Sequence, residues 1–375
     1  KYGFSIENVS TFEQTNYDLT VIFLPKGNNF KIKLDFNSEV YDPAFLSKYI
    51  KHYIEFIDIF LSNNLIETSQ LKLEKEEDDY LVLRPEYIKE TIVSKFIKTS
   101  IQRPNEVAIY DLNESCTYKD LNERSNQLAN YLKESKNIKS GDSIVLHLDR
   151  SVDSIVCILA IIKLNATYIP IDKTNPIDRL NYIIHDSNSK LLISDEPNAY
   201  PIDSINITEL DFSQFSTENI DESNLDSRVY IIYTSGSTGT PKGCQITHKN
   251  LVNYISWASD YYLSEKNING NTALYSSLSF DLTVTSIFLP LTQGKSISIY
   301  GNHLSIQETL TQIFSNSKID LIKITPAHIS LLAHLPITET HVKVLIVGGE
   351  ELKRQHLISI KKLNESIIIH NEYGP

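Results

Sequence analysis

From about residue 90 onward, short apolar runs alternate with stretches of helical periodicity. We expect strands at Val107–Tyr110, Ser143–Leu148, Lys190–Ser194, Val229–Tyr233, Ala273–Ser276, Ser296–Tyr300, Leu321–Ile324, Val342–Val347 and Ile367–His370. Strands separated by helices are typical of α/β domains with largely parallel sheets. Ligands of such domains bind in crevices at the carboxyl ends of the strands. The sequence therefore predicts an α/β fold with its site at those ends.

Helical patterns lie between several of these strands. Thr117, followed three residues later by Asp120, is a capping-box pair and predicts a helix that runs through Leu132. Val152–Leu164 predicts an apolar helix, and another helical pattern begins near His248.

The N-terminal region has a different pattern. Leu19–Leu24 and Phe30–Phe36 predict two strands, and the turn-rich Pro25–Asn29 between them predicts a hairpin. Ala44–Ser62 has apolar residues near one face of a helix. The charge-rich stretch Lys72–Tyr80 indicates an exposed connector. We therefore expect three segments: residues 1–65, a linker at residues 66–90, and a larger domain at residues 91–375.

Length, charge and cysteine content narrow the class of protein. At 375 residues the chain can hold about two to three domains of ~150 residues. A net charge of −12 without a Lys/Arg cluster argues against a nucleic-acid partner, and no apolar run reaches the ~20 residues of a membrane span. Three separated cysteines without a C-x-x-C pair favour a reducing, cytoplasmic setting. A start at Lys1, without initiator Met or signal peptide, indicates a piece of a longer protein.

The segment Tyr233–Gly243 carries the strongest functional signal. Its sequence, Tyr-Thr-Ser-Gly-Ser-Thr-Gly-Thr-Pro-Lys-Gly, lies between an apolar strand and a helical pattern. Glycines let the backbone approach a bulky anion, while amides, hydroxyls and a lysine interact with phosphate oxygens. The order Pro241-Lys242-Gly243 does not match the common P-loop, which ends in Gly-Lys-Ser/Thr. The segment therefore predicts a polyphosphate-binding loop, the alternative being a flexible linker.

With this loop, four further motifs resemble the adenylation domains of nonribosomal peptide synthetases, within the superfamily of adenylate-forming enzymes. They are Thr117–Leu121, Lys163–Asp172, Phe280–Thr283 and Asn371–Pro375, in the family's order and spacing over residues 90–375. Asn165 stands where the family usually has glycine, at a position that looks structural. The resemblance implies the large N-terminal subdomain of the adenylate-forming fold, with mostly parallel sheets flanked by helices and incomplete before the C-terminal lid.

The resemblance implies a two-step reaction with ATP and Mg²⁺. A carboxylate attacks the α-phosphorus of ATP and releases pyrophosphate, and the acyl adenylate then passes to a phosphopantetheine thiol on a carrier domain. Lys242 and Thr238 are the implied catalytic residues, with Thr234, Ser235 and Ser237 also beside the phosphates. Gly236, Gly239 and Gly243 are implied to keep the loop close to them.

Other positions are implied to hold adenine. Tyr373 resembles the family's stacking tyrosine, Gly348, Gly349 and Glu350 the strip along the other side of the ring, and Asn371 a residue near its edge. A Gly-Gly pair after a strand is otherwise an ordinary turn, and a tyrosine there is otherwise a core residue. For His248, where a helix begins, a structural role is favoured.

The resemblance also implies an amino-acid pocket. Asp281 corresponds to the aspartate that pairs with the substrate α-ammonium; a buried carboxylate needs such a cation, and the alternative is a helix cap. The remaining positions are Leu282, Thr285, Lys323, Ile346, Gly348 and Glu372. Lys323 and Glu372 together match a carboxamide, which has one carbonyl acceptor and an NH2 donor pair. The set resembles asparagine-activating pockets, with aspartate as the nearest rival and an ion pair without selective meaning as the alternative.

The N-terminal region, chiefly Asn16–Leu19 and the helix after it, resembles the C-terminal end of a condensation domain, an α+β remnant. The chain ends before the family's metal-binding glutamate and lid lysine, so no metal ligand is expected within it and residues 1–375 alone are expected to be nearly inactive. The implied partners are an amino acid, an upstream condensation domain and a downstream carrier domain, in secondary-metabolite synthesis. Two other hypotheses are an acyl- or aryl-CoA ligase and a non-catalytic nucleotide-binding scaffold.

Overall fold

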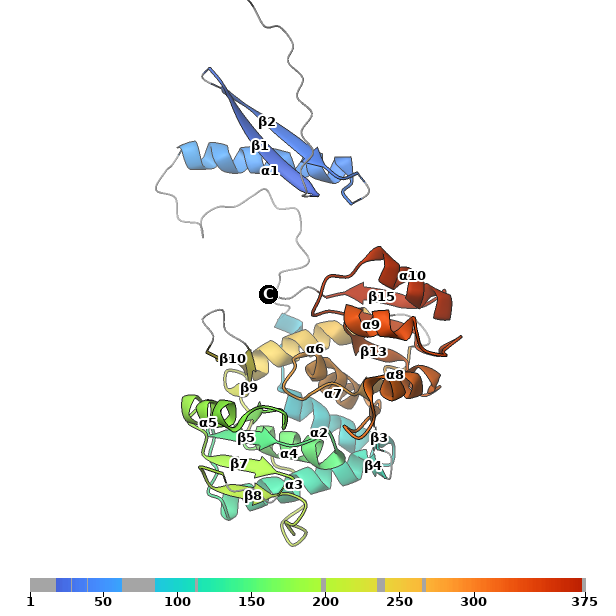
Figure 1. Ribbon diagram of the computed structural model, residues 1–375. Coiled ribbons are helices and arrows are strands. Elements are labelled where there is room, and N and C mark those ends of the chain that lie inside the picture. The colour runs from blue at the N-terminus through green and yellow to red at the C-terminus, as the bar shows by residue number, and fades with distance from the viewer. Residues whose placement is uncertain are drawn as a thin grey trace, which may run out of the picture. The chain divides into compact units, whose positions relative to one another are not determined.

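The computed structural model divides the chain into two compact units, Lys1–Val82 and Leu83–Pro375 (Figure 1). The structure describes residues 18–27, 29–38, 40–62, 85–111, 114–196, 200–234, 240–264 and 268–372. Each unit is described by itself.

The first unit contains a hairpin and one helix. Strands β1 (Leu19–Lys26) and β2 (Asn29–Phe36) pair antiparallel, and α1 (Pro43–Ser62) follows them. Pairing continues to Lys26 and Asn29, so the predicted five-residue turn at Pro25–Asn29 is wrong. Gly27, with φ of 60°, adopts the left-handed backbone that a tight hairpin turn requires.

The second unit begins with a short turn and contains two sheets. Its helices are η2 (Pro85–Tyr87), α2 (Ile92–Gln102), α3 (Tyr118–Glu134), α4 (Val152–Lys163), α5 (Ile177–Asp186), α6 (His248–Tyr262), α7 (Leu282–Gln293), α8 (Ile306–Ser315), α9 (Pro326–Leu332) and α10 (Arg354–Leu363). The predicted capping box at the start of α3 is confirmed, with Thr117 and Asp120 bonded reciprocally.

One sheet has six strands in the order β10-β9-β6-β5-β7-β8. Its strands are β5 (Ser143–His147), β6 (Thr167–Pro170), β7 (Leu191–Ser194), β8 (Ser204–Asn206), β9 (Arg228–Thr234) and β10 (Lys242–Thr247). All neighbours are parallel except the β9–β10 hairpin. Because side chains alternate along β5, Val145 packs in a cluster with α5, whereas Ile144 and Leu146 belong to the larger core with α3 and α4.

The other sheet has seven strands in the order β15-β14-β13-β11-β12-β3-β4. Its strands are β3 (Val107–Tyr110), β4 (Ser115–Thr117), β11 (Thr272–Leu274), β12 (Ile297–Ile299), β13 (Leu321–Ile324), β14 (Val344–Val347) and β15 (Ile368–Asn371). All neighbours are parallel except β3 and β4. One face packs on α8, α9 and α10, and the other shares the larger core with α2, α6, α7 and the six-stranded sheet.

The α/β prediction is confirmed, and each of the nine predicted strands is present. Four strands were not predicted, β4, β6, β8 and β10. β4 and β8 have three residues each, too few for a periodic pattern. β10 changes the description of the predicted phosphate loop, because the segment after Tyr233 connects two antiparallel strands rather than a strand and a helix.

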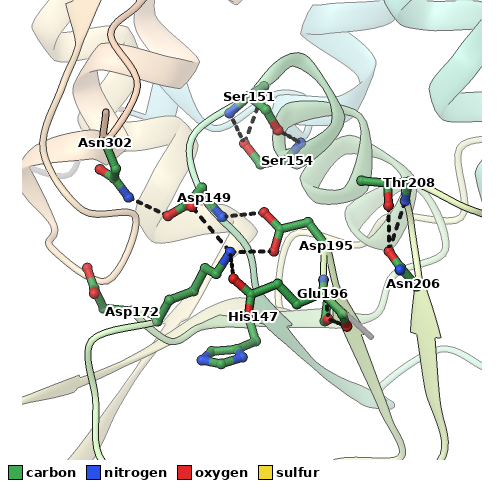
Figure 2. A network of polar contacts seen from close by, with 12 residues as sticks. His147, Asp149, Ser151, Ser154, Asp172, Asp195, Glu196, Asn206, Thr208 and Asn302 are labelled. Atoms are coloured by element: carbon green, nitrogen blue, oxygen red, sulfur yellow. Dashed lines mark hydrogen bonds and ion pairs between the residues drawn. The ribbon is translucent and has the colours of Figure 1, made fainter. Parts of the chain in front are cut away.

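A polar network joins the carboxyl ends of the two sheets (Figure 2). Lys173, just after β6, forms ion pairs with Asp149 (3.2 Å), Asp195 (2.8 Å) and Glu196 (2.6 Å), which follow β5 and β7. Burial lowers the pKa of Lys173, but hydrogen bonds to these carboxylates outweigh it and raise the pKa above its usual value. Asn302, after β12 of the other sheet, donates to Asp149. The network therefore holds loops of both sheets together.

The family motif Lys163–Asp172 begins with residues that have a structural role. Lys163, at the end of α4, is fully buried and donates to side-chain oxygens of Asn122 (2.8 Å), Ser125 (2.7 Å) and Asn126 (2.6 Å) on α3. Burial holds its pKa well below the usual value. Asn165 has a φ of 57°, the left-handed region that glycine enters most easily and asparagine next. This backbone explains why asparagine can replace the family's glycine.

Candidate active site

The predicted phosphate loop connects β9 to β10. Thr234 ends β9 and pairs with Lys242, which begins β10, and both residues are exposed. The predicted residues Ser235, Gly236, Ser237, Thr238 and Gly239 lie outside the described residues. The described part therefore places a hydroxyl and a lysine at the two ends of the connection, where both are accessible to an anion.

Gly243 has a packing reason to be glycine. A Cβ atom there would lie 2.8 Å from Cγ2 of Ile231 and 3.0 Å from Cζ of Tyr233, both on the neighbouring strand. Tyr233 donates to Asp186 at the end of α5 (2.6 Å), and Tyr182 of the same helix donates to the Pro241 carbonyl (3.2 Å). The start of β10 is thus held against β9 and α5.

The predicted adenine strip follows β14. Gly349 has a φ of 87°, which favours glycine because a side chain would be strained there. Glu350 accepts a hydrogen bond from the backbone N–H of Ala327 at the start of α9 (3.0 Å). Asn371 is exposed at the end of the neighbouring strand β15, paired with Val347, and Tyr373 lies outside the described residues. Gly349, Glu350 and Asn371 therefore share the carboxyl edge of β14 and β15.

Asp281 differs from its prediction. It precedes the buried helix α7 and is exposed, so the argument that a buried carboxylate requires a cation is wrong at this position. It also makes no side-chain hydrogen bond to cap α7, so the helix-cap alternative is not observed. Phe280 beside it is 60% exposed, which shows that this turn lies at the surface of the described structure.

Lys323 and Glu372 form the centre of the predicted amino-acid pocket. Their Nζ and Oε2 atoms lie 2.6 Å apart, with side-chain exposures of 7% and 24%. Lys323 Nζ also donates to Thr285 Oγ1 (3.1 Å) on α7 and to the Tyr254 hydroxyl (3.3 Å) on α6. Three elements that are distant in the sequence therefore meet at one ammonium group.

Two tyrosines of α6 complete the environment of Glu372. The hydroxyls of Tyr254 (2.9 Å) and Tyr262 (2.5 Å) both donate to Oε1 of Glu372. Burial raises the pKa of Glu372, but the charge of Lys323 and hydrogen bonds from Lys323, Tyr262 and Tyr254 outweigh it and lower the pKa below its usual value. Burial, followed by Glu372 itself, raises the pKa of Tyr254. Glu372 is thus ionised at neutral pH and Tyr254 remains a neutral donor.

The remaining pocket residues lie around this pair. A Cβ atom on Gly348 would lie 3.3 Å from the Glu372 carbonyl oxygen and 4.0 Å from Cδ2 of Leu282. Ile346 is buried on β14 and pairs with Lys323 on one side and His370 on the other. Leu282, Thr285, Lys323, Ile346, Gly348 and Glu372 are therefore brought together, with Asp281 directly before Leu282.

Sequence reasoning missed Tyr254 and Tyr262. Both lie on α6, eight positions apart, a spacing that places them on one helix face. Aromatic residues at that spacing usually indicate core packing, so the pattern alone does not distinguish a packed ring from a hydroxyl that binds a carboxylate. His248, for which the sequence favours a structural role, begins α6. It is fully buried, and burial lowers its pKa to about 4.

Comparison with known proteins identifies the family. The sequence profile described as AMP-binding enzyme matches residues 97–375, most of the chain. The chain belongs to the AMP-binding enzyme family. The AMP-binding region contains both sheets, the β9–β10 hairpin and the Lys323–Glu372 pocket, with β3 as its first strand.

The curated relatives of this AMP-binding chain are peptide synthetases. It is 37% identical over 388 residues to tyrocidine synthase 3 of Brevibacillus parabrevis and 34% identical over 383 residues to bacitracin synthase 3 of Bacillus licheniformis. Both matches cover 100% of this chain but only 6% of the relative. Together with the family match, they confirm the predicted adenylation domain of a nonribosomal peptide synthetase.

Solved structures agree in fold. The N-terminal subdomain of Klebsiella oxytoca NpsA, in complex with 3-hydroxyanthranilyl-AMSN, matches 76% of this chain and 72% of that chain with a TM-score of 0.67 at 20% identity. The nonribosomal peptide synthetase FmoA3 matches 96% of this chain and 40% of that chain with a TM-score of 0.72 at 15% identity. No helix among the described residues is long and apolar enough to cross a membrane.

Proposed function

We propose that this chain activates L-asparagine with ATP, forming asparaginyl adenylate and pyrophosphate, for transfer to the phosphopantetheine thiol of a carrier domain. The observation that carries the substrate assignment is the Lys323–Glu372 pair, a donor and an acceptor 2.6 Å apart in the predicted pocket. The family and the peptide-synthetase relatives support the reaction class.

In the proposed first step, an oxygen of the asparagine carboxylate bonds to the α-phosphorus as the bond to the pyrophosphate oxygen breaks. The reaction joins two anions, so charge neutralisation and positioning matter more than covalent help. Lys242, exposed at the start of β10, supplies positive charge near the departing pyrophosphate. The proposed hydroxyl donors are Thr234, Ser235, Ser237 and Thr238, with Gly236, Gly239 and Gly243 beside them.

Adenine is proposed to lie against Gly348, Gly349 and Glu350, with Tyr373 stacked on it and Asn371 near its edge. The open, left-handed backbone at Gly349 fits a flat ring, because among the described residues outside its chain neighbours only Thr325 Cγ2 would lie within 4 Å of a Cβ there, at 3.7 Å. For Mg²⁺, no group of three or more His, Cys, Asp or Glu residues suited to a metal occurs among the described residues. No step is therefore assigned to the metal.

The pocket favours a carboxamide over its competitors on charge. Lys323 uses its three N–H donors on Glu372, Thr285 and Tyr254, so it donates to the side-chain carbonyl in place of the longest of these contacts, the one of 3.3 Å to the Tyr254 hydroxyl. Ionised Glu372 accepts from the side-chain NH2. An aspartate carboxylate would lose that second contact and be repelled by Glu372. An apolar side chain would leave the remaining acceptor position on Glu372 Oε2 without a donor, which costs free energy when that oxygen loses water. Leu282 and Ile346 provide apolar surface beside the pair.

Four alternatives to this proposal remain testable. The substrate could be aspartate, the protein could be an acyl- or aryl-CoA ligase or a nucleotide-binding scaffold without catalysis, and the Lys323–Glu372 ion pair could have no role in substrate selection. The surface position of Asp281 leaves its contact with a substrate ammonium resting on the family resemblance. The paired Lys323 and Glu372 favour a polar, amide-bearing side chain over an aryl acid.

We also propose that residues 1–65 are the C-terminal end of a condensation domain, followed by a linker at residues 66–90 and the adenylation region at residues 91–375. Support comes from α1, where Phe45, Tyr49, Tyr53 and Phe56 are exposed in the described unit, as expected for a helix that packs on further residues of a larger domain. An upstream condensation domain and a downstream carrier domain are the proposed partners, in secondary-metabolite synthesis.

The test is amino-acid-dependent pyrophosphate exchange in an enzyme extended through the lid, across the twenty standard amino acids. We expect asparagine to give the highest rate. Glutamine should be a detectable second substrate, because one extra methylene provides only ~1–3 kcal/mol of discrimination. A clear preference for aspartate would show that Glu372 is protonated or turned away. A preference for an apolar amino acid would refute the pocket assignment.

A further inference from the structure

The hydroxyls around Glu372 form a network whose direction can be assigned. Tyr254 and Tyr262 each give their single hydroxyl proton to Oε1 of Glu372. The Tyr254 oxygen is then an acceptor for Thr285 Oγ1, 2.7 Å away, and for Lys323 Nζ. Each phenol has only one proton and gives it to Glu372, so the hydrogen bonds that run through Tyr254 and Tyr262 both end on Glu372 as the acceptor.

We propose that Tyr254 and Tyr262 are specificity-determining positioning residues, which fix Glu372 as an acceptor and thereby select a carboxamide side chain over a carboxylate. This inference rests on the proposed amino-acid activation. Neither tyrosine belongs to the pocket residues predicted from the sequence. The two phenols fill the acceptor positions of Oε1, and Lys323 occupies one position on Oε2. A carboxylate offers about four acceptor positions, so one remains on Oε2 for a substrate N–H.

Neutral donors suit this task because they add no charge to the pocket. With Glu372 ionised, its charge balances that of Lys323, and the pocket is neutral toward an asparagine side chain. If Glu372 took up a proton, Lys323 would be left in excess and Glu372 would itself become a donor. Such a pocket would bind the aspartate carboxylate, so the two tyrosines control which substrate fits.

The aromatic surroundings provide a matched control. Tyr261, next to Tyr262 on α6, contacts the rings of Trp257 (5.0 Å between centroids) and His370 (5.0 Å), as Tyr262 does (5.4 Å and 4.8 Å). Within the described structure, however, Tyr261 has no hydrogen bond to Glu372, and it is 48% exposed. Tyr261→Phe therefore removes a hydroxyl from the same ring cluster without touching Glu372.

The experiment compares kcat/KM for asparagine and aspartate in the extended enzyme. In Tyr262→Phe and in Tyr254→Phe we expect the asparagine-to-aspartate ratio to fall about tenfold or more, since a hydrogen bond to a charged group is among the stronger ones. In Tyr261→Phe we expect the ratio of the unmodified enzyme. If one variant did not fold, the other would carry the same test. Trp257 packs against the rings of Tyr254 and Tyr262, so the change in tryptophan fluorescence on adding amino acid without ATP measures binding at this site, and unfolding followed by the same signal checks the fold.

A pH series separates this role from a loss of packing. The ionisable groups that face Glu372 in the described structure are Lys323 of β13, Tyr254 and Tyr262 of α6, and His370 of β15. Removing a phenol makes Glu372 easier to protonate, so aspartate use by the variants should rise as pH falls, earlier than in Tyr261→Phe. His370 is common to all variants, and its titration therefore cancels in that comparison.

Three outcomes separate the test of the inference from the test of the proposed function. If the unmodified enzyme prefers asparagine and all three tyrosine variants keep its asparagine-to-aspartate ratio, the inference is overturned and the proposed function stands. If the unmodified enzyme exchanges pyrophosphate with neither asparagine nor aspartate, both are overturned. A lowered ratio in Tyr262→Phe or Tyr254→Phe, with Tyr261→Phe unchanged, supports both.

Discussion

The proposed amino-acid pocket around Lys323 and Glu372 and the proposed phosphate-binding hairpin β9–β10 differ in how firmly the fold holds their charged groups in place. In the pocket, Lys323 is 7% exposed and both charged groups have several polar partners within hydrogen-bond distance. At the hairpin, Lys242 and Thr234 are exposed at the strand ends. A buried pair of charged groups held by several hydrogen bonds can discriminate between side chains of similar shape, whereas an exposed lysine acts mainly through its charge.

Substitutions in the two regions should also differ in their effect on stability. Changing one member of a buried charge pair leaves the other unpaired, so both stability and selection should suffer. Changing an exposed lysine usually alters stability by less than about 0.5 kcal/mol, so its effect should be confined to chemistry. The following predictions test this division, in the order of expected size and in an enzyme extended through the lid.

The largest effect is expected from Lys323→Met. It removes the partner of Glu372 and the donor for the substrate carbonyl, so kcat/KM for asparagine should fall at least about a hundredfold. The free energy of unfolding should fall by about 2–3 kcal/mol, less than for a fully buried pair because Glu372 is partly exposed. Exchange kinetics and urea unfolding measure the two effects.

The matched control for Lys323→Met is the double variant Lys323→Met with Glu372→Gln. It removes the unpaired charge, so stability should recover while asparagine selection does not. If Lys323→Met alone kept full selection for asparagine, the ion pair would have no selective role.

Lys242→Ala should lower turnover about tenfold to a hundredfold, since one charge-assisted contact is worth roughly 1.5–3 kcal/mol. Asparagine binding, followed by Trp257 fluorescence, and thermal stability should stay nearly constant. Lys242→Arg, which keeps the charge, should retain more turnover than Lys242→Ala. Unchanged pyrophosphate exchange in Lys242→Ala would refute the phosphate-binding assignment of the hairpin.

Gly243→Ala tests the packing of the hairpin itself. The new Cβ would lie 2.8 Å from Ile231 Cγ2, so the strand or the side chain must shift, at a cost of about 1–3 kcal/mol. We expect a lower unfolding free energy and slower turnover, with asparagine binding less affected. Cys244→Ala, at the next and exposed position of β10, is the control that introduces no such contact. Equal stability of both variants would contradict the structural role of Gly243.

Much of the fold follows from the sequence because its signals are local. Apolar runs such as Leu321–Ile324 predict buried strands, and the Thr117–Asp120 pair predicts a helix start, and both are observed. β10 was missed because its exposed residues, among them Lys242 and Cys244, lack an apolar pattern and depend on pairing with β9. The exposure of Asp281 was missed for a related reason, since burial of a turn residue depends on which elements cover it.

The proposed pocket, too, could be predicted from the sequence only in part. Lys323 in an apolar strand already indicates a paired lysine, and its partner Glu372 follows from the family motif. Tyr254 and Tyr262 could not be assigned, because the hydroxyl of a helix tyrosine acquires a role only when β15 brings Glu372 beside it. Contacts between distant segments are the part of the site that sequence patterns leave open.

The smallest predicted effect is a pH dependence of stability from Glu372. Its pKa in the folded protein is lower than the ordinary value of 4.5, since the charge of Lys323 and three hydrogen bonds outweigh burial. A depressed carboxylate contributes stability that is fully present above the unfolded pKa and is lost as pH falls through the folded pKa. Urea unfolding from pH 7 to pH 3 should therefore show the unmodified enzyme losing stability more steeply than Glu372→Gln below about pH 4.5. Parallel curves for the two would mean that Lys323 and the tyrosines do not hold Glu372 ionised. The pocket would then resemble the exposed hairpin, and the contrast between the two regions would not hold.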